Sequence, residues 1–116
     1  NPAFIQLLAG AIIAGLTFIF GLLKIPKSIA TKLVQYGAII VIAIIDTENK
    51  AKTAEARNTK LYDSAEKLGM ASEFVAKAIE TSPNRNIFGK ITKTLGGVAN
   101  VVNIAFPIIK PFLKKG

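Results

Sequence analysis

The chain of 116 residues contains no cysteine, no histidine and no tryptophan. Without cysteine and histidine, a disulfide scaffold and a Cys/His zinc site are excluded. The usual nucleophile–base pairs of enzymes draw on the same two residue types, so an enzymatic role is not expected. The sequence also has no P-loop and no GxGxxG fingerprint. We therefore expect no catalytic residue, no cofactor and no bound metal.

Acidic residues are absent from both ends of the sequence. All seven carboxylates lie in residues 46–80, where six basic residues accompany them. Residues 1–45 and 81–116 carry the other nine basic residues and no acid, and the net charge is +8. A polyanion or an anionic lipid surface is the natural partner for such segments. The alternative is the ordinary lysine excess of a soluble surface.

Apolar sequence is abundant. Hydrophobic residues make up 51% of the chain and the mean hydropathy is +0.44, which excludes disorder. The stretch Ala3–Leu23 is uncharged, and its hydrogen-bonding side chains are Gln6 and Thr17. As a helix it would span roughly 31 Å, the thickness of a bilayer's hydrocarbon core. It must be surrounded by lipid or by protein, and a chain this short can barely supply that cover alone.

The periodicity predicts an all-α fold in a single domain, residues 1–116, with four helices forming two hairpins. The first hairpin covers about residues 3–50 and the second about residues 51–115. Pro26 is expected to end the first helix near Lys24. Nothing between Asp46 and Ala51 breaks a helix, so the second and third helices can be continuous. Asn1 in place of an initiator Met is compatible with a removed leader.

The clearest turn, residues 81–86, separates the third predicted helix from the fourth. In the fourth helix, Gly96 and Gly97 are expected to loosen the helix and to permit close helix packing. Pro107 and Pro111 are expected to kink or end it, because proline lacks the backbone donor and its ring collides with the preceding turn.

Two basic turns form the candidate binding site. If the hairpins lie side by side in the same sense, both turns lie at one end of the bundle. The six basic side chains are Lys24, Lys27, Lys32, Arg85, Lys90 and Lys93. Such an end would neutralise phosphates of DNA or of lipid headgroups without reading bases, because no aromatic platform lies among them. The alternative is an unspecific basic rim.

Small and apolar residues at helical spacing form the candidate packing surface between subunits. Ala11 and Gly15 make a small-xxx-small pair, which allows helices to approach closely. The third predicted helix carries an apolar seam at 4-3 spacing. The residues expected to pack between subunits are Ala11, Gly15, Leu61, Leu68, Val75 and Ile79.

Apolar helices that one chain cannot cover favour assembly with many copies of itself. A subunit of a rod- or tube-like virion would hold double-stranded DNA through non-specific contacts with its basic surface. A conjugative, type IV secretion-like pilin would use that surface in an extracellular pilus, against lipid headgroups or DNA. A membrane-inserting pore-former or holin is a third class, permitted by the uncharged first helix and the lysine-rich tail.

The all-helical, cysteine-free, strongly hydrophobic chain, rich in Ile, Lys and Asn, resembles major capsid proteins of archaeal spindle-shaped viruses, particularly the monocaudavirus type. The resemblance covers the whole chain in pattern and includes no diagnostic motif, so no functional residue carries over. It implies a helical-hairpin protein that resides in the host membrane before assembly and stacks around DNA in the virion. The chain is also similar to conjugative pilins, but its second half, residues 51–116, departs from them.

Overall fold

The computed structural model describes residues 2–20 and 27–113, with side chains for residues 3–15 and 32–113. These residues form five α-helices and no strand. The helices are α1 (Pro2–Phe20), α2 (Lys27–Ala56), α3 (Ser64–Glu80), α4 (Arg85–Thr94) and α5 (Val98–Leu113). The all-α prediction is confirmed, whereas the predicted number of four helices is wrong.

The additional helix arises at Gly96 and Gly97. Their φ angles are +94° and +103°, a region in which glycine is at ease and other residues are strained. The Gly97 amide donates to the Thr92 carbonyl at 2.9 Å, and the Gly96 amide donates to the Lys93 carbonyl at 3.2 Å. This is the pattern of a helix closed by a left-handed residue. The pair therefore ends α4, and α5 leaves at a bend of 78°, so the expected loosening of one long helix is wrong.

Two further boundaries differ from the expected ones. α2 continues past residue 50 to Ala56, where Asn58 (φ 53°) closes it and the Thr59 amide donates to the Ala54 carbonyl at 2.9 Å. α5 includes Pro107 and Pro111 and continues to Leu113, so the prolines do not end this helix. The expected end of the first helix near Lys24 lies outside the described residues.

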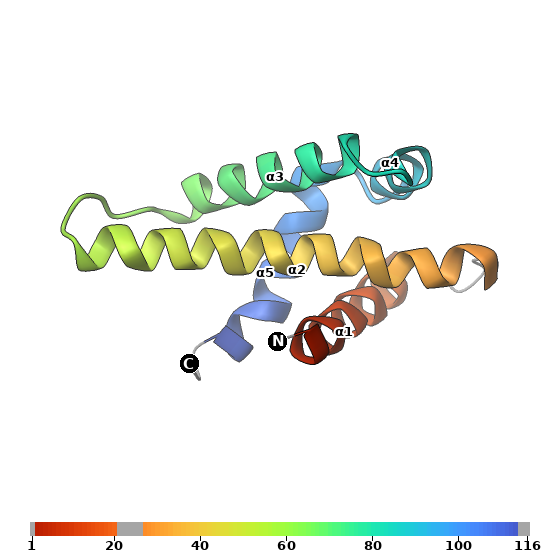
Figure 1. The fold of residues 1–116 in the computed structure, drawn as a ribbon, viewed down its shortest axis with the longest axis horizontal. Coiled ribbons are helices and arrows are strands. Elements are labelled where there is room, and N and C mark those ends of the chain that lie inside the picture. Colours follow the sequence, from red (N-terminus) through yellow and green to blue (C-terminus); the bar gives the residue numbers. More distant parts are fainter. Residues whose placement is uncertain (1, 21–26, 114–116) are drawn as a thin grey trace.

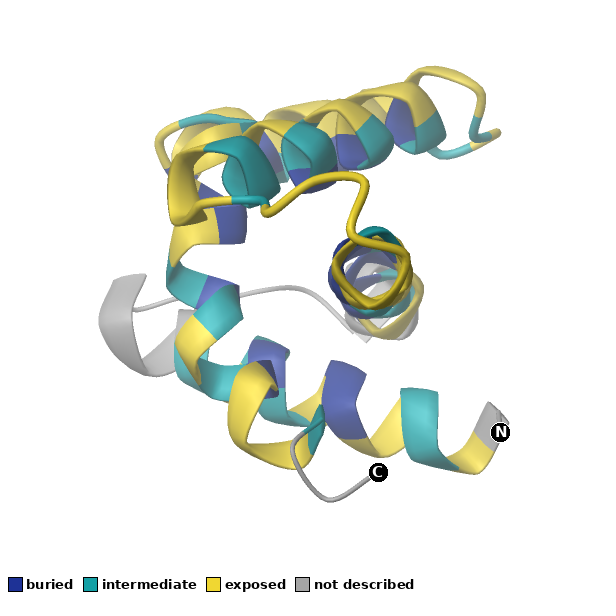
Figure 2. Cartoon of the chain, turned by 90° about the vertical axis from the view of Figure 1, so that its left-hand side faces the viewer, coloured by how far each residue is buried: buried dark blue, intermediate teal, exposed yellow. Residues whose placement is uncertain are grey.

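α2 is the central element of the fold. It runs along the longest dimension of a molecule of 48 × 26 × 24 Å (Figure 1). α3 lies on one side of α2, α1 lies on the opposite side, and α5 crosses behind (Figure 1). Viewed near its axis, α2 has neighbours on three sides, and no helix of the described residues covers its fourth side (Figure 2).

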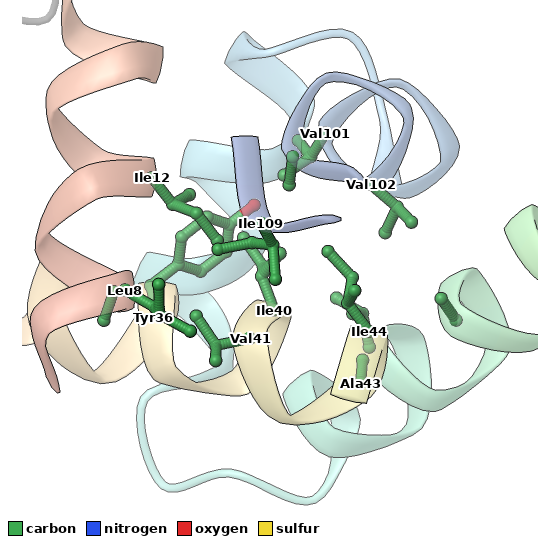
Figure 3. Close-up of a cluster of buried hydrophobic side chains, with 14 of the residues drawn as sticks. Leu8, Ile12, Tyr36, Ile40, Val41, Ala43, Ile44, Val101, Val102 and Ile109 are labelled. Carbon is green, nitrogen blue, oxygen red and sulfur yellow. The ribbon is translucent and has the colours of Figure 1, made fainter. Parts of the chain in front are cut away.

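The core lies between α2 and the three helices around it. Ile12 of α1, Ile40 of α2 and Ile109 of α5 are fully buried and converge in its centre (Figure 3). α1 approaches α2 closely at Gly37, where an added Cβ would lie 2.9 Å from the Ala9 carbonyl oxygen and 3.2 Å from Ala9 Cα. Glycine at this position thus sets the distance between α1 and α2.

The chain itself covers one side of α1. Leu8, Ala9 and Ile12 are buried, whereas Leu7 and Gly10 are exposed, Leu7 to 65%. The sequence predicted that the first helix needs cover on every side. Within the described residues, this chain covers α1 on one side. By length and apolar composition, no single helix in the described residues is sufficient to cross a bilayer, and α4 with α5 passes that test as a bent pair.

Candidate functional site

The first candidate site is the end of the molecule where the turn before α4 meets the start of α2. The side-chain amide of Asn84 (Nδ2) donates to Gln35 Oε1 at 3.1 Å, which ties this turn to the third turn of α2. One residue further on, the Tyr36 hydroxyl lies 2.8 Å from Thr92 Oγ1, and its ring packs against Phe88 with centroids 5.6 Å apart. These contacts hold α4 against the N-terminal half of α2.

Those contacts bring the predicted basic residues of both hairpins to one end. Arg85, Lys90 and Lys93 are exposed on α4, and Lys32 is half-buried one turn before Tyr36 on α2. Lys27 is the first residue of α2, but its side chain lies outside the described set, as does all of Lys24. We call Lys32, Arg85, Lys90 and Lys93 the basic end.

The basic end has no counter-charge of its own. The ion pairs of the described residues lie elsewhere: Lys50–Asp46 at 3.1 Å, Lys60–Glu66 at 2.6 Å and Lys67–Glu48 at 3.3 Å. None of the four side chains of the basic end forms an ion pair within the described part of the chain. The acid nearest to it in sequence is Glu80, at the end of α3. The positive charge is therefore available to an external anion.

Tyr36 is a buried residue of α2 that holds α4, which carries most of the basic end, against α2. Because the Thr92 hydroxyl donates to the Phe88 carbonyl at 2.7 Å, the Tyr36 hydroxyl is the donor in its bond to Thr92. Burial raises the pKa of Tyr36 to about 12. This neutral, buried hydroxyl holds α4 in place and does not contribute charge.

The predicted packing residues are mostly used within the chain. Val75 and Ile79 are buried in its own core, and Leu68 is half-buried against that core. At Gly15, an added Cβ would lie 2.8 Å from Ile108 Cδ1, so this glycine admits α5. For Val75 and Ile79 the expectation of packing between subunits is corrected, because α2 and α5 already cover them.

Ala11 and Leu61 complete the predicted packing set. Ala11 is half-buried on α1, one turn before the glycine that admits α5. Leu61 is 74% exposed and lies in the loop before α3, outside any helix. The expected 4-3 seam extends one turn too far, because Asp63 caps α3 and fixes its start at Ser64.

The second candidate site is an apolar surface that the periodicity did not single out. Two large apolar side chains of α2 are exposed, Val34 at 43% and Ile42 at 41%. Ala38 and Ile45 are half-buried between and beyond them, and Ile45 lies at the edge of this surface, beside the hollow between α1, α2 and α5. We call Val34, Ala38, Ile42 and Ile45 the open face of α2. Their 4-4-3 spacing was visible in the sequence, but it lay within a run that was apolar on all sides.

The hollows of the molecule are amphipathic. One hollow of about 510 Å³ lies between α1, α2 and α5 and is lined by Phe4, Ile45, Glu48, Asn49, Lys52, Phe112 and Leu113. Glu48 is 9% exposed and lies 3.3 Å from Lys67 Nζ, so its charge is neutralised within the chain. No group of three or more His, Cys, Asp or Glu residues that could hold a metal occurs in the described part of the chain.

Comparison with protein-family models, with curated proteins and with solved structures finds no match to this chain. The basic end and the open face of α2 are therefore the features that indicate a function.

Proposed function

We propose that the chain is a self-assembling structural subunit, most specifically a major capsid protein that forms a tubular or spindle-shaped shell around DNA. Its partners would be many copies of itself and double-stranded DNA, with host membrane lipid as a stage before assembly. The virion is its proposed location. A non-enzymatic role is part of the same proposal.

The observation that carries the proposal is the apolar surface that the described helices leave exposed after forming their own core. Among the described side chains, five large hydrophobic ones are more than 40% exposed: Leu7, Val34, Ile42, Leu61 and Phe112. Scattered single residues of this kind are normal on a surface. Here, however, the open face of α2 continues over three turns without a charge, and contiguous apolar surface of that kind is typical of an interaction site.

The basic end supports the choice of DNA as the enclosed partner. Its side chains are lysines and an arginine without counter-charges, and no exposed aromatic residue lies among them in the described segment. Such a surface neutralises phosphates independently of base sequence. In an assembly of many copies, these ends would form a repeated positive lining.

The composition of purified particles tests the proposal. Nuclease treatment followed by extraction should leave protected double-stranded DNA, with no preferred sequence beyond that of the genome packaged. Stoichiometric phospholipid without DNA would favour the conjugative pilin instead. A detergent-dependent monomer that releases dye from vesicles would favour a pore-former, for which the bent α4–α5 pair provides candidate membrane segments.

A further inference from the structure

The open face of α2 is a long uncharged surface of the described chain. α3, α1 and α5 occupy the other three sides of α2, so the surface faces outwards between α3 and α1 (Figures 1 and 2). No charged residue occurs in α2 between Lys32 and Asp46. An occupant of this surface must therefore be apolar over three helical turns and must meet charges at both ends.

The charges at the two ends are opposite and lie on the same flank. Fourteen residues separate Lys32 from Asp46, which at 3.6 residues per turn places them within about 40° of each other around α2. That flank faces α3, because Asp46 lines a hollow of about 270 Å³ together with Met70, Glu73 and Phe74 of α3. Lys50 and Lys77 also line this hollow, and Asp46 pairs with Lys50 at 3.1 Å. Glu73 forms no ion pair within the described residues, so Glu73 is the carboxylate at this end that is open to a further cation.

A second copy of this chain has the complementary pattern. When two identical helices pack face to face and antiparallel around a two-fold axis, each flank meets the same flank of its partner. With the axis near Ile39, Lys32 of each copy lies level with Asp46 of the other. In the same arrangement, Val34 lies within one residue of the level of Ile45, and the small Ala38 lies near the centre.

We propose that the open face of α2 binds the same face of a second copy, antiparallel and two-fold symmetric, with Lys32 of each copy beside Asp46 and Glu73 of the other. A parallel two-fold pair would place the Lys32–Asp46 flanks of the two copies on opposite sides of the contact, so that Lys32 would meet neither carboxylate of its partner. This inference rests on the proposed self-assembly and identifies one interface between its subunits. Leu7 and Phe112, outside this face, remain for further contacts.

Charge reversal tests the pairing without relying on a lost contact. In Lys32→Glu, each symmetric contact brings the new carboxylate against Asp46, and in Asp46→Lys it brings two lysines together. Each variant alone should dimerise at least about tenfold more weakly than the wild-type chain. An equimolar mixture should bind more tightly than either variant alone, because the mixed pair contains no like-charge contact. At one of its two contacts the new lysine lies beside the new carboxylate. At the other, the wild-type Lys32 lies beside the wild-type Asp46.

Analytical ultracentrifugation of each variant and of the mixture supplies the measurement. Lys110→Glu is the matched control, since it reverses an exposed lysine on α5, on the other side of α2 from the open face, and it should dimerise like the wild type. Asp46→Lys also removes the exposed pair with Lys50, so thermal unfolding of each variant verifies that it is folded. A mixture no stronger than its components would overturn the pairing.

Cross-linking tests the direction independently, because the chain has no cysteine of its own. Val34→Cys and Ile45→Cys should form a mixed disulfide when combined, and little homodimer when each is oxidised alone. In the antiparallel pair, equivalent residues at position 34 are offset by about 16 Å along the helix, beyond the reach of a disulfide. Homodimers of Val34→Cys would show a parallel pair and overturn the proposal.

These outcomes also separate this inference from the proposed function. Particles that assemble normally from variants unable to form the mixed disulfide would sink the antiparallel contact and leave self-assembly intact. A wild-type chain that stays monomeric at all concentrations would sink both.

Discussion

At the scale of single residues, the close approach of α1 to α2 depends on Gly37. An added Cβ would lie within 3.2 Å of the Ala9 carbonyl oxygen, Cα and Cβ, and backbone atoms cannot move aside as a flexible side chain does. The same residue type occurs in α3 at Gly69 and in α4 at Gly89, where an added Cβ would have open space. The three glycines therefore form a matched set for a stability measurement.

Gly37→Ala should lower the free energy of unfolding by about 1–3 kcal/mol, because the methyl group overpacks the contact between α1 and α2. Gly69→Ala and Gly89→Ala should raise it by about 0.5–1 kcal/mol, because alanine loses less conformational entropy in a helix. Urea unfolding followed by circular dichroism gives all three values. Equal changes at the three positions would contradict the described α1–α2 contact.

Ionisation of Tyr36 should lower the stability of the fold at alkaline pH. Its folded pKa of about 12 exceeds the ordinary value of 10, so the folded state binds the phenolic proton more tightly than the unfolded state does. The resulting stabilisation is complete below pH 10 and is lost as the pH rises towards 12. Its upper bound is about 3 kcal/mol, from a shift of about two pKa units.

The corresponding experiment compares the wild-type chain with Tyr36→Phe between pH 8 and 11.5. The difference in unfolding free energy between the two proteins should shift in favour of Tyr36→Phe as the pH rises above 10. Lysine titration in the same range is common to both and cancels. A difference that stays constant over the whole range would show that Tyr36 is not buried as described.

At the scale of elements, the start of α3 is fixed by hydrogen bonds between residues close together in the sequence. The Glu66 amide donates to Asp63 Oδ1 at 2.7 Å, and the Asp63 amide donates to Glu66 Oε1 at 3.3 Å. This capping box satisfies backbone donors at the helix start. Hydrogen bonds from Lys60 and from the Asp63 backbone also lower the pKa of Glu66. The cap is why Leu61 falls outside α3.

Replacing the cap should therefore weaken α3. Asp63→Ala should cost about 1 kcal/mol of unfolding free energy, whereas Asp63→Asn should be nearly neutral, because asparagine caps almost as well. Chemical denaturation of the two variants distinguishes them. If Asp63→Asn were as destabilising as Asp63→Ala, the carboxylate charge rather than the cap would be the stabilising feature.

The helices themselves could be predicted from the sequence, and their ends only in part. Long apolar runs and the turn at residues 81–86 were sufficient to place helices around Ile12, Ile40 and Val75. The end of α2 depends on Asn58 in a left-handed conformation, a role that an asparagine in a polar stretch does not reveal by itself. Gly96 and Gly97 carried a helix-stop pattern, but the apolar periodicity continued across them and favoured one helix.

The candidate site was predictable to a similar extent. Collecting Arg85 and Lys32 at one end required only that two hairpins lie in the same sense, and the contact between Asn84 and Gln35 brings them there. The open face of α2 was not predictable, because a helix with apolar residues on all sides does not reveal which side its own chain will cover. Packing alone separates buried Ile40 from exposed Ile42.

At the scale of the whole molecule, acidic residues are confined to the middle of the sequence. The basic end forms no ion pair within the described residues, while all seven acids lie between Asp46 in α2 and Glu80 at the end of α3. Reversing three cations of α4 with Arg85→Glu, Lys90→Glu and Lys93→Glu should therefore weaken DNA binding. If each contacts one phosphate, the slope of log K against log salt should fall by about 3.

A triple variant at Lys52, Arg57 and Lys110 is the matched control. It makes the same change in net charge at exposed positions away from the basic end. Fluorescence anisotropy with a DNA duplex at several salt concentrations gives both slopes. If the two triple variants lost the same slope, binding would reflect net charge alone, and the basic end would be an unspecific rim.

The proposed function depends on assembly, in which neighbouring copies cover the open face of α2 and the exposed side of α1. Negative-stain electron microscopy of native, undissociated material is the most direct measurement of that claim. We expect regular tubes or spindle-shaped particles built from this chain, with a dense nuclease-protected interior. A homogeneous field of isolated subunits at high protein concentration, with no ordered particle, would contradict it.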